Sequence, residues 1–380
     1  MKKSLLALAI GTFALGIAEF AMMGILSAVA RELDVSIVKA GNLISAYSAG
    51  VAIGAPGLVL LRRWPLKRLL LLLTAMIAVG NAAAALSPGY YTLLAARFVS
   101  GLPHGAFFGA GAIVCSRLAD VGKGAQAVAV MVGGMTVANV VGVPGATFVT
   151  NVISWRVAFA IVSFFGMLAF AGMRAWVPYL KPLPDSGLKG QFRFLRHAEP
   201  WLVYAGVFFG QASVYTYLSY IDPVMTEVAG FSAASMSWIM VVAGLGMVVG
   251  NMLAAKLSDR YSAALVTGIL AACVVVIMPV LYLCASMKVP VVILSFVATA
   301  CLFGIGGPLQ YIIVRYAKGG EMLGGAGIQI AFNVSNAIAA VLGGAAIHAG
   351  FGIASPALAG IPCAVIGAAA LFILHYRYKA

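Results

Sequence analysis

Charged residues are scarce in this chain of 380 residues: Asp, Glu, Lys and Arg together make up 9%, against about 25% in typical domains. A soluble protein of this length must cover its surface with polar side chains, so the composition excludes a soluble globular fold. The hydrophobic content of 63% also excludes a disordered chain, because disorder needs low hydrophobicity and high charge. We therefore predict an all-α protein that crosses a membrane several times.

Motifs for nucleotide and enzyme sites are also missing. The chain has no GxxxxGK[ST] loop, so ATP-driven transport is not expected, and no HExxH or GxSxG motif of a protease or hydrolase. Its five cysteines form no CxxC pair and lie within or beside apolar segments, where they are typical small buried residues. We expect no cofactor, no metal and no enzyme activity.

The net charge of +14 does not indicate nucleic-acid binding, because the basic residues lie in short clusters between apolar segments. Nineteen of the 24 Lys and Arg residues lie near the two termini or in every second loop, which places them on one side of the membrane. Positively charged loops remain in the cytoplasm. We therefore predict a multi-pass membrane protein, with both termini cytoplasmic and the lipid bilayer as its surroundings.

Apolar windows long enough to cross a bilayer, about 20 residues each, follow one another along the chain. Charged residues, Pro or Gly separate them, and an even number places both termini on one side. Twelve windows are expected, at residues 4–30, 40–61, 69–87, 91–116, 123–150, 155–177, 200–222, 234–255, 263–285, 289–314, 323–348 and 353–376.

The longest polar segment lies at mid-chain and suggests two halves. We predict an N-terminal six-helix bundle at 1–177, a cytoplasmic linker at 178–199 and a C-terminal six-helix bundle at 200–380. Residue pairs offset by 194–197 positions recur in order and favour an internal repeat. The pairs are Gly16 and Gly210, Ser36 and Ser232, Gly50 and Gly246, Gly54 and Gly250, Arg63 and Arg260, Lys123 and Lys318, and Asn139 and Asn333.

Glu19 is the one acidic residue well inside an apolar window. At about 1.5 Å per helical residue it lies about 22 Å beyond Ser4, slightly past the membrane midplane. An ionised group there costs at least about 2.5–3.5 kcal/mol, so such residues usually have a function. We expect Glu19 to bind and release a proton, with a permanently paired or neutral structural residue as the alternative.

The fourth window supplies a partner for that carboxylate. Arg97 and His104 are seven residues apart and share one helix face, and Pro103 can bend the helix between them. A nearby Arg97 would favour ionised Glu19, and separating the two would favour proton uptake. His104 can relay the proton or contact the substrate, or it can be a neutral histidine bonded between helices.

Uncharged polar side chains form a second group of candidates. Amides and phenols suit hydroxyl-rich or zwitterionic ligands, but they also join membrane helices at about 0.6 kcal/mol per contact. We name five as candidate substrate contacts: Gln211 and Tyr215 in the seventh window, Gln310 in the tenth, and Gln329 and Asn333 in the eleventh.

Three strings in the first half resemble twelve-span drug/sugar:proton antiporters of the major facilitator superfamily. They are Gly11-Thr12-Phe13 continuing to Glu19-Phe20, the segment from Arg97 to Gly109, and the segment from Gly134 to Pro144. The likeness is greatest to an arabinose-inducible, sugar-efflux branch and covers essentially the whole chain. It implies two six-helix bundles, alternating access and export driven by inward proton flow.

The resemblance also assigns gating residues. An antiporter motif of the fifth span corresponds loosely to Gly142 and Pro144, although a second family glycine is replaced by Ala146. In the loop between the second and third windows, Arg63 is present but the acid that precedes it in the family is replaced by a base. The counterpart in the second half keeps Asp259 and Arg260, so we expect gating to depend on that copy.

We interpret the chain as a secondary transporter that exports a small organic solute, a sugar or sugar-like molecule, by proton antiport. Its expected partners are that solute and protons, and we assume a monomer. The alternatives are a multidrug antiporter for amphiphilic cations and an uncoupled facilitator. A membrane-embedded transferase and a transport-like receptor are the alternatives outside transport.

Overall fold

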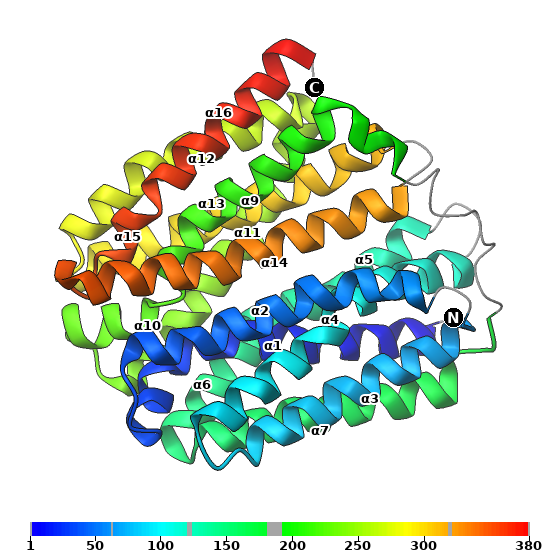
Figure 1. The fold of residues 1–380 in the computed structure, drawn as a ribbon, viewed down its shortest axis with the longest axis horizontal. Coiled ribbons are helices and arrows are strands. Elements are labelled where there is room, and N and C mark those ends of the chain that lie inside the picture. Colours follow the sequence, from blue (N-terminus) through cyan, green and yellow to red (C-terminus); the bar gives the residue numbers. More distant parts are fainter. Residues whose placement is uncertain (1, 62–63, 120–123, 181–191, 318–320, 379–380) are drawn as a thin grey trace.

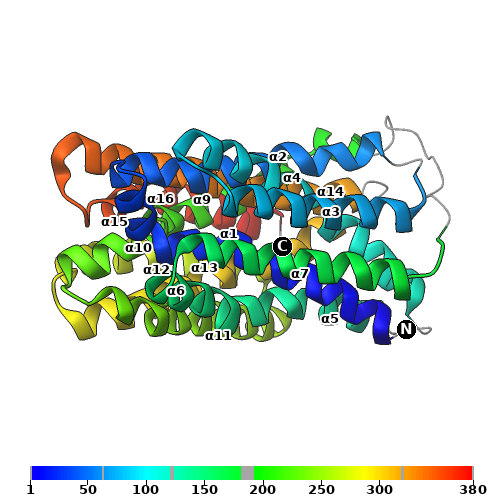
Figure 2. The ribbon, with the colours of Figure 1, turned by 90° about the horizontal axis from the view of Figure 1, so that it is seen from below.

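The structure is a computed structural model, and it describes residues 2–61, 64–119, 124–180, 192–317 and 321–378. Long helices run side by side between two ends of the molecule in both views (Figures 1 and 2). We call the end where α1 begins the terminal end. The opposite end, where α1 finishes and α2 begins, is called the far end.

The first half of the chain forms one group of helices, blue to green in Figure 1. Its fifth span is interrupted by a π-helical segment, η1, where a proline follows closely. The elements are α1 Lys2–Glu32, α2 Ile37–Leu60, α3 Leu66–Ala85, α4 Tyr90–Leu118, α5 Gly124–Val137, η1 Ala138–Gly142, α6 Val143–Val152 and α7 Trp155–Trp176.

The second half forms the other group, green to red in Figure 1. Short 3-10 or π segments precede or follow several of its helices. The elements are η2 Arg193–Arg196, α9 Ala198–Leu218, α10 Ile221–Pro223, η3 Val224–Val228, η4 Ala233–Ser235, α11 Met236–Arg260, α12 Ala263–Leu283, α13 Lys288–Tyr316, α14 Glu321–Ala346, η5 Ile347–Phe351, α15 Pro356–Ala359 and α16 Ile361–Tyr378.

Ten helical segments of the described chain are long and apolar enough to cross a membrane. The helices α2 and α9 are not among these ten, although both pack against neighbouring spans over their length. Each carries charge near its start, Lys39 in α2 and Glu199 in α9. The fold is all-helical as expected, and the count of twelve spans stays a prediction.

Large apolar side chains cover much of the outer surface. Ile269, Val276 and Ile373 are among those exposed to the surroundings. A soluble monomer rarely exposes so many large apolar side chains, whereas lipid accepts them. Polar side chains such as Glu19 and Arg97 are buried inside instead. The molecule therefore has the distribution of polarity that a bilayer requires.

Glycines that the sequence analysis paired occupy equivalent places in the two halves. Gly54 of α2 lies against the Leu102 carbonyl of α4, and Gly250 of α11 lies against the Ala300 carbonyl of α13. A Cβ at either glycine would collide with that carbonyl oxygen. Both helix pairs therefore cross at backbone contact, the close packing that small residues permit in membranes.

The buried apolar side chains of the described residues form three cores. The largest joins both halves and lies toward the far end, while each half has a separate core toward the terminal end. The shared core includes Leu43, Tyr217 and Met240; the first half's own core includes Leu8, Leu70 and Val114; and the second half's includes Val207, Leu309 and Leu371. The halves are thus packed together at the far end.

We predict that Gly54→Leu and Gly250→Leu each destabilise the protein, because an overpacked helix contact typically costs about 1–3 kcal/mol. The melting temperature in detergent should fall by several degrees for either variant. Gly133→Leu is the matched control, since no atom lies within 4 Å of a Cβ built at Gly133. Equal melting temperatures for all three variants would contradict the close crossings.

Candidate functional site

Glu19 lies near the middle of α1 and is buried, with 1% of its surface exposed. Neither carboxylate oxygen has a hydrogen-bond partner among the described residues. His104 lies beside this carboxylate, with its Nε2 3.8 Å from Glu19 Oε2. The two residues that the sequence placed on different spans are therefore brought together inside the first half.

His104 is held in place by two aromatic neighbours. Its Nδ1 shares a hydrogen bond of 2.8 Å with the Tyr47 hydroxyl of α2, and its ring stacks on Phe108 with centroids 5.3 Å apart. These contacts orient Nε2 toward Glu19. The sequence analysis missed Tyr47, for which the available signal was a phenol in the middle of an apolar window.

Arg97 is completely buried and joins three helices. Its Nη1 donates to the Ala18 carbonyl of α1 at 2.6 Å, and its Nε donates to the Leu43 carbonyl of α2 at 3.3 Å. The guanidinium carbon lies 4.3 Å from the centre of the Tyr47 ring. Arg97 interacts electrostatically with Glu19, although no ion pair within 4.0 Å joins these two described residues.

Aromatic rings connect this cluster to the second half. The Tyr215 ring of α9 meets the Phe332 ring of α14 edge-on at 5.5 Å. Phe332 is 6.4 Å from Phe303 of α13, which is 5.9 Å from Phe20, the neighbour of Glu19. Tyr215 is buried, its hydroxyl lacks a partner among the described residues, and it interacts electrostatically with Glu19.

The candidate amides differ in their burial. Gln211 and Asn333 are buried, whereas Gln310 and Gln329 are half-buried. Gln211 donates to the Leu302 carbonyl at 3.4 Å, and Asn333 donates to the Gln329 backbone carbonyl at 3.0 Å. In each of these two amides the side-chain oxygen has no partner among the described residues.

Asn336, three residues beyond Asn333, is also completely buried. Neither atom of its amide group has a partner within the described part of the chain. Unpartnered buried polar atoms are uncommon in folded proteins and call for an explanation such as water or a ligand. The three amides therefore leave polar atoms free in the interior of the second half.

The candidate gating residues fall in two places. Gly142 ends η1 and lies against Ile17 of α1, and Pro144 is at the start of α6. On its other side η1 packs against α11 of the second half. Arg63 and the Asp259 side chain lie outside the described residues, while Arg260 is exposed, with its guanidinium 5.6 Å from the Tyr261 ring centre.

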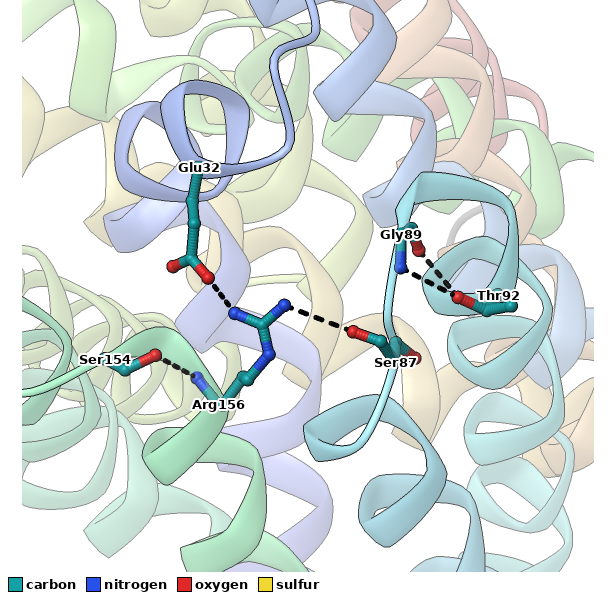
Figure 3. A network of polar contacts seen from close by, with 6 residues as sticks. All are labelled: Glu32, Ser87, Gly89, Thr92, Ser154 and Arg156. Carbon is teal, nitrogen blue, oxygen red and sulfur yellow. Dashed lines mark hydrogen bonds and ion pairs between the residues drawn. The ribbon is translucent and has the colours of Figure 1, made fainter.

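A polar network at the far end joins elements of the first half (Figure 3). Arg156 of α7 pairs with Glu32 at the end of α1 and donates to the Ser87 carbonyl at 3.2 Å. The Ser154 hydroxyl accepts from the Arg156 backbone N–H at 3.2 Å and caps α7. The network therefore holds the end of α1 to the rest of its own half.

Asp222 is a buried carboxylate that the sequence analysis did not single out. It lies in α10, immediately after α9, and 4% of its surface is exposed. Its Oδ2 accepts a hydrogen bond of 2.6 Å from the Ser27 backbone N–H of α1. Asp222 is the last residue of the seventh apolar window, where the sequence predicts an exposed helix end and gives no sign of burial.

The described residues contain no group of three or more His, Cys, Asp or Glu side chains that could hold a metal ion. The site is therefore composed of one carboxylate, one guanidinium, one imidazole, phenols and amides. Such groups can bind and transfer protons and can form hydrogen bonds to a polar solute.

A family model described as "Major Facilitator Superfamily" matches residues 8–328. A protein of Escherichia coli (strain K12) named "Putative transporter AraJ" is 43% identical over 382 residues, covering 100% of this chain and 96% of that protein. "Inner membrane transport protein YdhP" of the same strain is 34% identical over 340 residues, covering 89% of this chain and 87% of that protein.

Two further similarities are more distant. "Chloramphenicol resistance protein" of Streptomyces lividans is 29% identical over 335 residues, covering 87% of this chain and 85% of that protein. A solved structure of a bacterial homologue of the human lysosomal transporter Spinster, titled inward-facing and unoccupied, has a TM-score of 0.75 at 16% identity. The alignment covers 98% of this chain and 96% of that chain, so the fold is shared.

We predict that Arg97→Lys destabilises the protein far more than Arg156→Lys. Lysine cannot reproduce two hydrogen bonds from a planar group that also stacks on a ring, and at Arg97 the loss is completely buried. Arg156 and its partner Glu32 are partly exposed, and such pairs contribute about 0–1 kcal/mol. Thermal unfolding of both variants in detergent measures the difference, and a larger effect at Arg156 would contradict the prediction.

Proposed function

We propose that this chain, which belongs to the Major Facilitator Superfamily, exports a small organic solute in exchange for protons. The expected resemblance to that family is confirmed, and the chain is a transporter and not an enzyme. It is also a multi-pass protein of the inner membrane, given the ten apolar helices in the described part of the chain and its relatives named as inner membrane transport proteins.

The buried Glu19 carboxylate is the observation that carries the proposal. An ionised carboxylate without a hydrogen-bond partner is costly in a buried site, so Glu19 should gain a proton or a new partner during transport. His104, whose Nε2 lies 3.8 Å from Glu19 Oε2, would relay that proton. Arg97 stabilises the ionised form when water or movement of α1 brings the two charges into contact.

Alternating access would open the two ends in turn. At the far end the two halves share one apolar core, whereas at the terminal end each half has a core of its own. This difference supports a state open toward the terminal end. The basic residues at that end favour its cytoplasmic location. We propose that residues 1–177 and 200–380 rock as two bundles joined by the linker at 178–199.

The gating residues belong to the same proposal. Gly142 and Pro144 lie where a π-helical segment interrupts the fifth span and packs against α1, and π-helical segments are frequent at functional sites. Asp259 and Arg260 would act at the terminal end, where the halves separate. A monomer suffices, because the halves enclose the path between them.

A sugar or sugar-like solute fits the free polar atoms of the second half. Gln211, Tyr215 and Asn333 each bury a side-chain oxygen without a partner in the described chain, and such oxygens can accept hydrogen bonds from hydroxyl groups. Gln310 and Gln329 are half-buried on the neighbouring helices α13 and α14.

A multidrug antiporter is the second candidate function. The rings of Phe20, Phe303, Phe332 and Tyr215 form a continuous aromatic path beside Glu19. Aromatic faces attract cations, and a carboxylate completes a site for an amphiphilic cation. One relative is named for chloramphenicol resistance, which favours testing aromatic drugs as well as sugars.

We predict that Glu19→Gln abolishes solute-evoked proton release from everted membrane vesicles with an acid interior. The substitution keeps the shape of the side chain but removes the group that titrates. Glu32→Gln is the matched control, because Glu32 lies on the same helix but is partly exposed at its far end. This control should keep proton release within about twofold of the native rate.

The solute panel comprises pentoses, hexoses, chloramphenicol and lipophilic cations, so it also separates the two candidate functions. Proton release that persists in Glu19→Gln would contradict the role of Glu19 and make His104 the next site to test. Movement of labelled solute with no proton release in the native protein would indicate an uncoupled facilitator.

We also predict that Asn333→Ala raises the KM for the transported solute about tenfold or more, since removing one hydrogen bond from a buried polar site costs about 1–3 kcal/mol. The control is Asn81→Ala. Asn81 is a buried amide with the same bonding pattern, because its Nδ2 donates to the Ile77 carbonyl of its own helix and its Oδ1 has no partner among the described residues. It differs in its place, since α3 packs mainly against α4 and α7 of the first half. A KM that is unchanged in Asn333→Ala would remove Asn333 from the binding site.

A further inference from the structure

Polar contacts join the two halves at the far end. The Ser45 hydroxyl of α2 donates to the Ala337 carbonyl of α14 at 2.9 Å. The Asn151 amide at the end of α6 donates to the Ala233 carbonyl at 2.7 Å. The third is the bond of 2.6 Å from the Ser27 N–H to Asp222. Of the three, it alone has a carboxylate as its acceptor.

That bond differs from the others in strength. Hydrogen bonds to an ionised acceptor are about twice as strong as neutral ones, and Asp222 is buried, so water competes weakly for it. The charged groups that interact with Asp222 are Arg31 of α1 and Glu227 of η3. Arg31 attracts the carboxylate from the first half, and Glu227 belongs to the same half as Asp222.

The two partners belong to different rigid groups. Ser27 is in the last part of α1, and the Arg156–Glu32 network holds the end of α1 to α7. Asp222 lies just after α9. Two residues before it, the Tyr220 hydroxyl donates to the Ala340 carbonyl of α14 at 2.8 Å, which holds this segment to the second half. Separation of the halves at the far end must therefore break the bond between Ser27 and Asp222.

We propose that Asp222 is a gating residue that keeps the far end closed by accepting the Ser27 N–H across the two halves. The inference rests on alternating access within the proposed function and adds a residue outside the Glu19 site. Loss of Asp222 shifts the balance of the two conformations toward the one that is open at the far end.

Distances between spin labels at the two ends test the gate. Cysteines replace Val152 and Ser232 for the far-end pair, and Arg68 and Lys256 for the terminal-end pair, in a full-length chain whose five native cysteines are serine. Asp222→Ala should lower the ratio of far-end-closed to far-end-open molecules about tenfold, the factor expected for a lost bond to a charged group. Asp222→Asn, which retains an acceptor oxygen, should lower it less.

The terminal-end pair gives the readout that a purely structural role would not produce. Gating predicts that this distance shortens in Asp222→Ala as the far-end distance lengthens. Glu227→Gln is the matched control, because it removes a charge from an exposed neighbour that has no bond to the first half among the described residues. It should leave both distances unchanged.

An unchanged far-end distance in folded Asp222→Ala would overturn the proposal. Lengthening at both ends, which indicates loosened packing, would overturn it as well. Opposite shifts at the two ends would support the gate even if Glu19→Gln left proton release intact. The label distances do not depend on proton coupling, so failure of the gate and failure of antiport are distinguishable.

Discussion

The cost of placing charge inside a low-dielectric interior shapes this molecule. In a membrane every backbone polar group must be bonded internally, so the chain consists of helices and turns its apolar side chains outward. Glu19 and Arg97 are exceptions, because both are charged groups inside the protein. Contacts with the surrounding helices compensate for only part of the free-energy cost of burying these charges. Arg97 gains two carbonyls and the face of Tyr47, while Glu19 gains no hydrogen bond among the described residues.

This asymmetry separates structural from transport roles. Arg97 joins α1, α2 and α4 in this structure through two of its nitrogens, while its Nη2 has no partner among the described residues. In the proposed transport cycle, Glu19, whose oxygens have no hydrogen-bond partner among the described residues, changes its protonation or its partners when the helices move. The far end shows the same contrast: Glu32 is paired within its own half, whereas Asp222 binds across the halves.

Much of this organisation is predictable from local sequence. Glu19 stands out because an acid within an apolar window is costly wherever the helix packs, and His104 and Arg97 share a face by helical spacing alone. The glycine pairs at offset 196 predicted equivalent positions in the two halves, and the structure has Gly54 and Gly250 at equivalent helix crossings. Tyr47 and Asp222 could not be found this way, because their importance depends on distant residues.

The sequence by itself determined that the protein is helical and membrane-embedded, and which of its acids is buried deepest in a span. These properties follow from composition, window length and the cost of charge, which are local along the chain. Only the tertiary structure decided that His104 faces Glu19, that Arg97 bonds to backbone carbonyls, and that Asp222 meets α1. Such contacts depend on how helices rotate and cross, and small residues spread over the whole chain set those crossings.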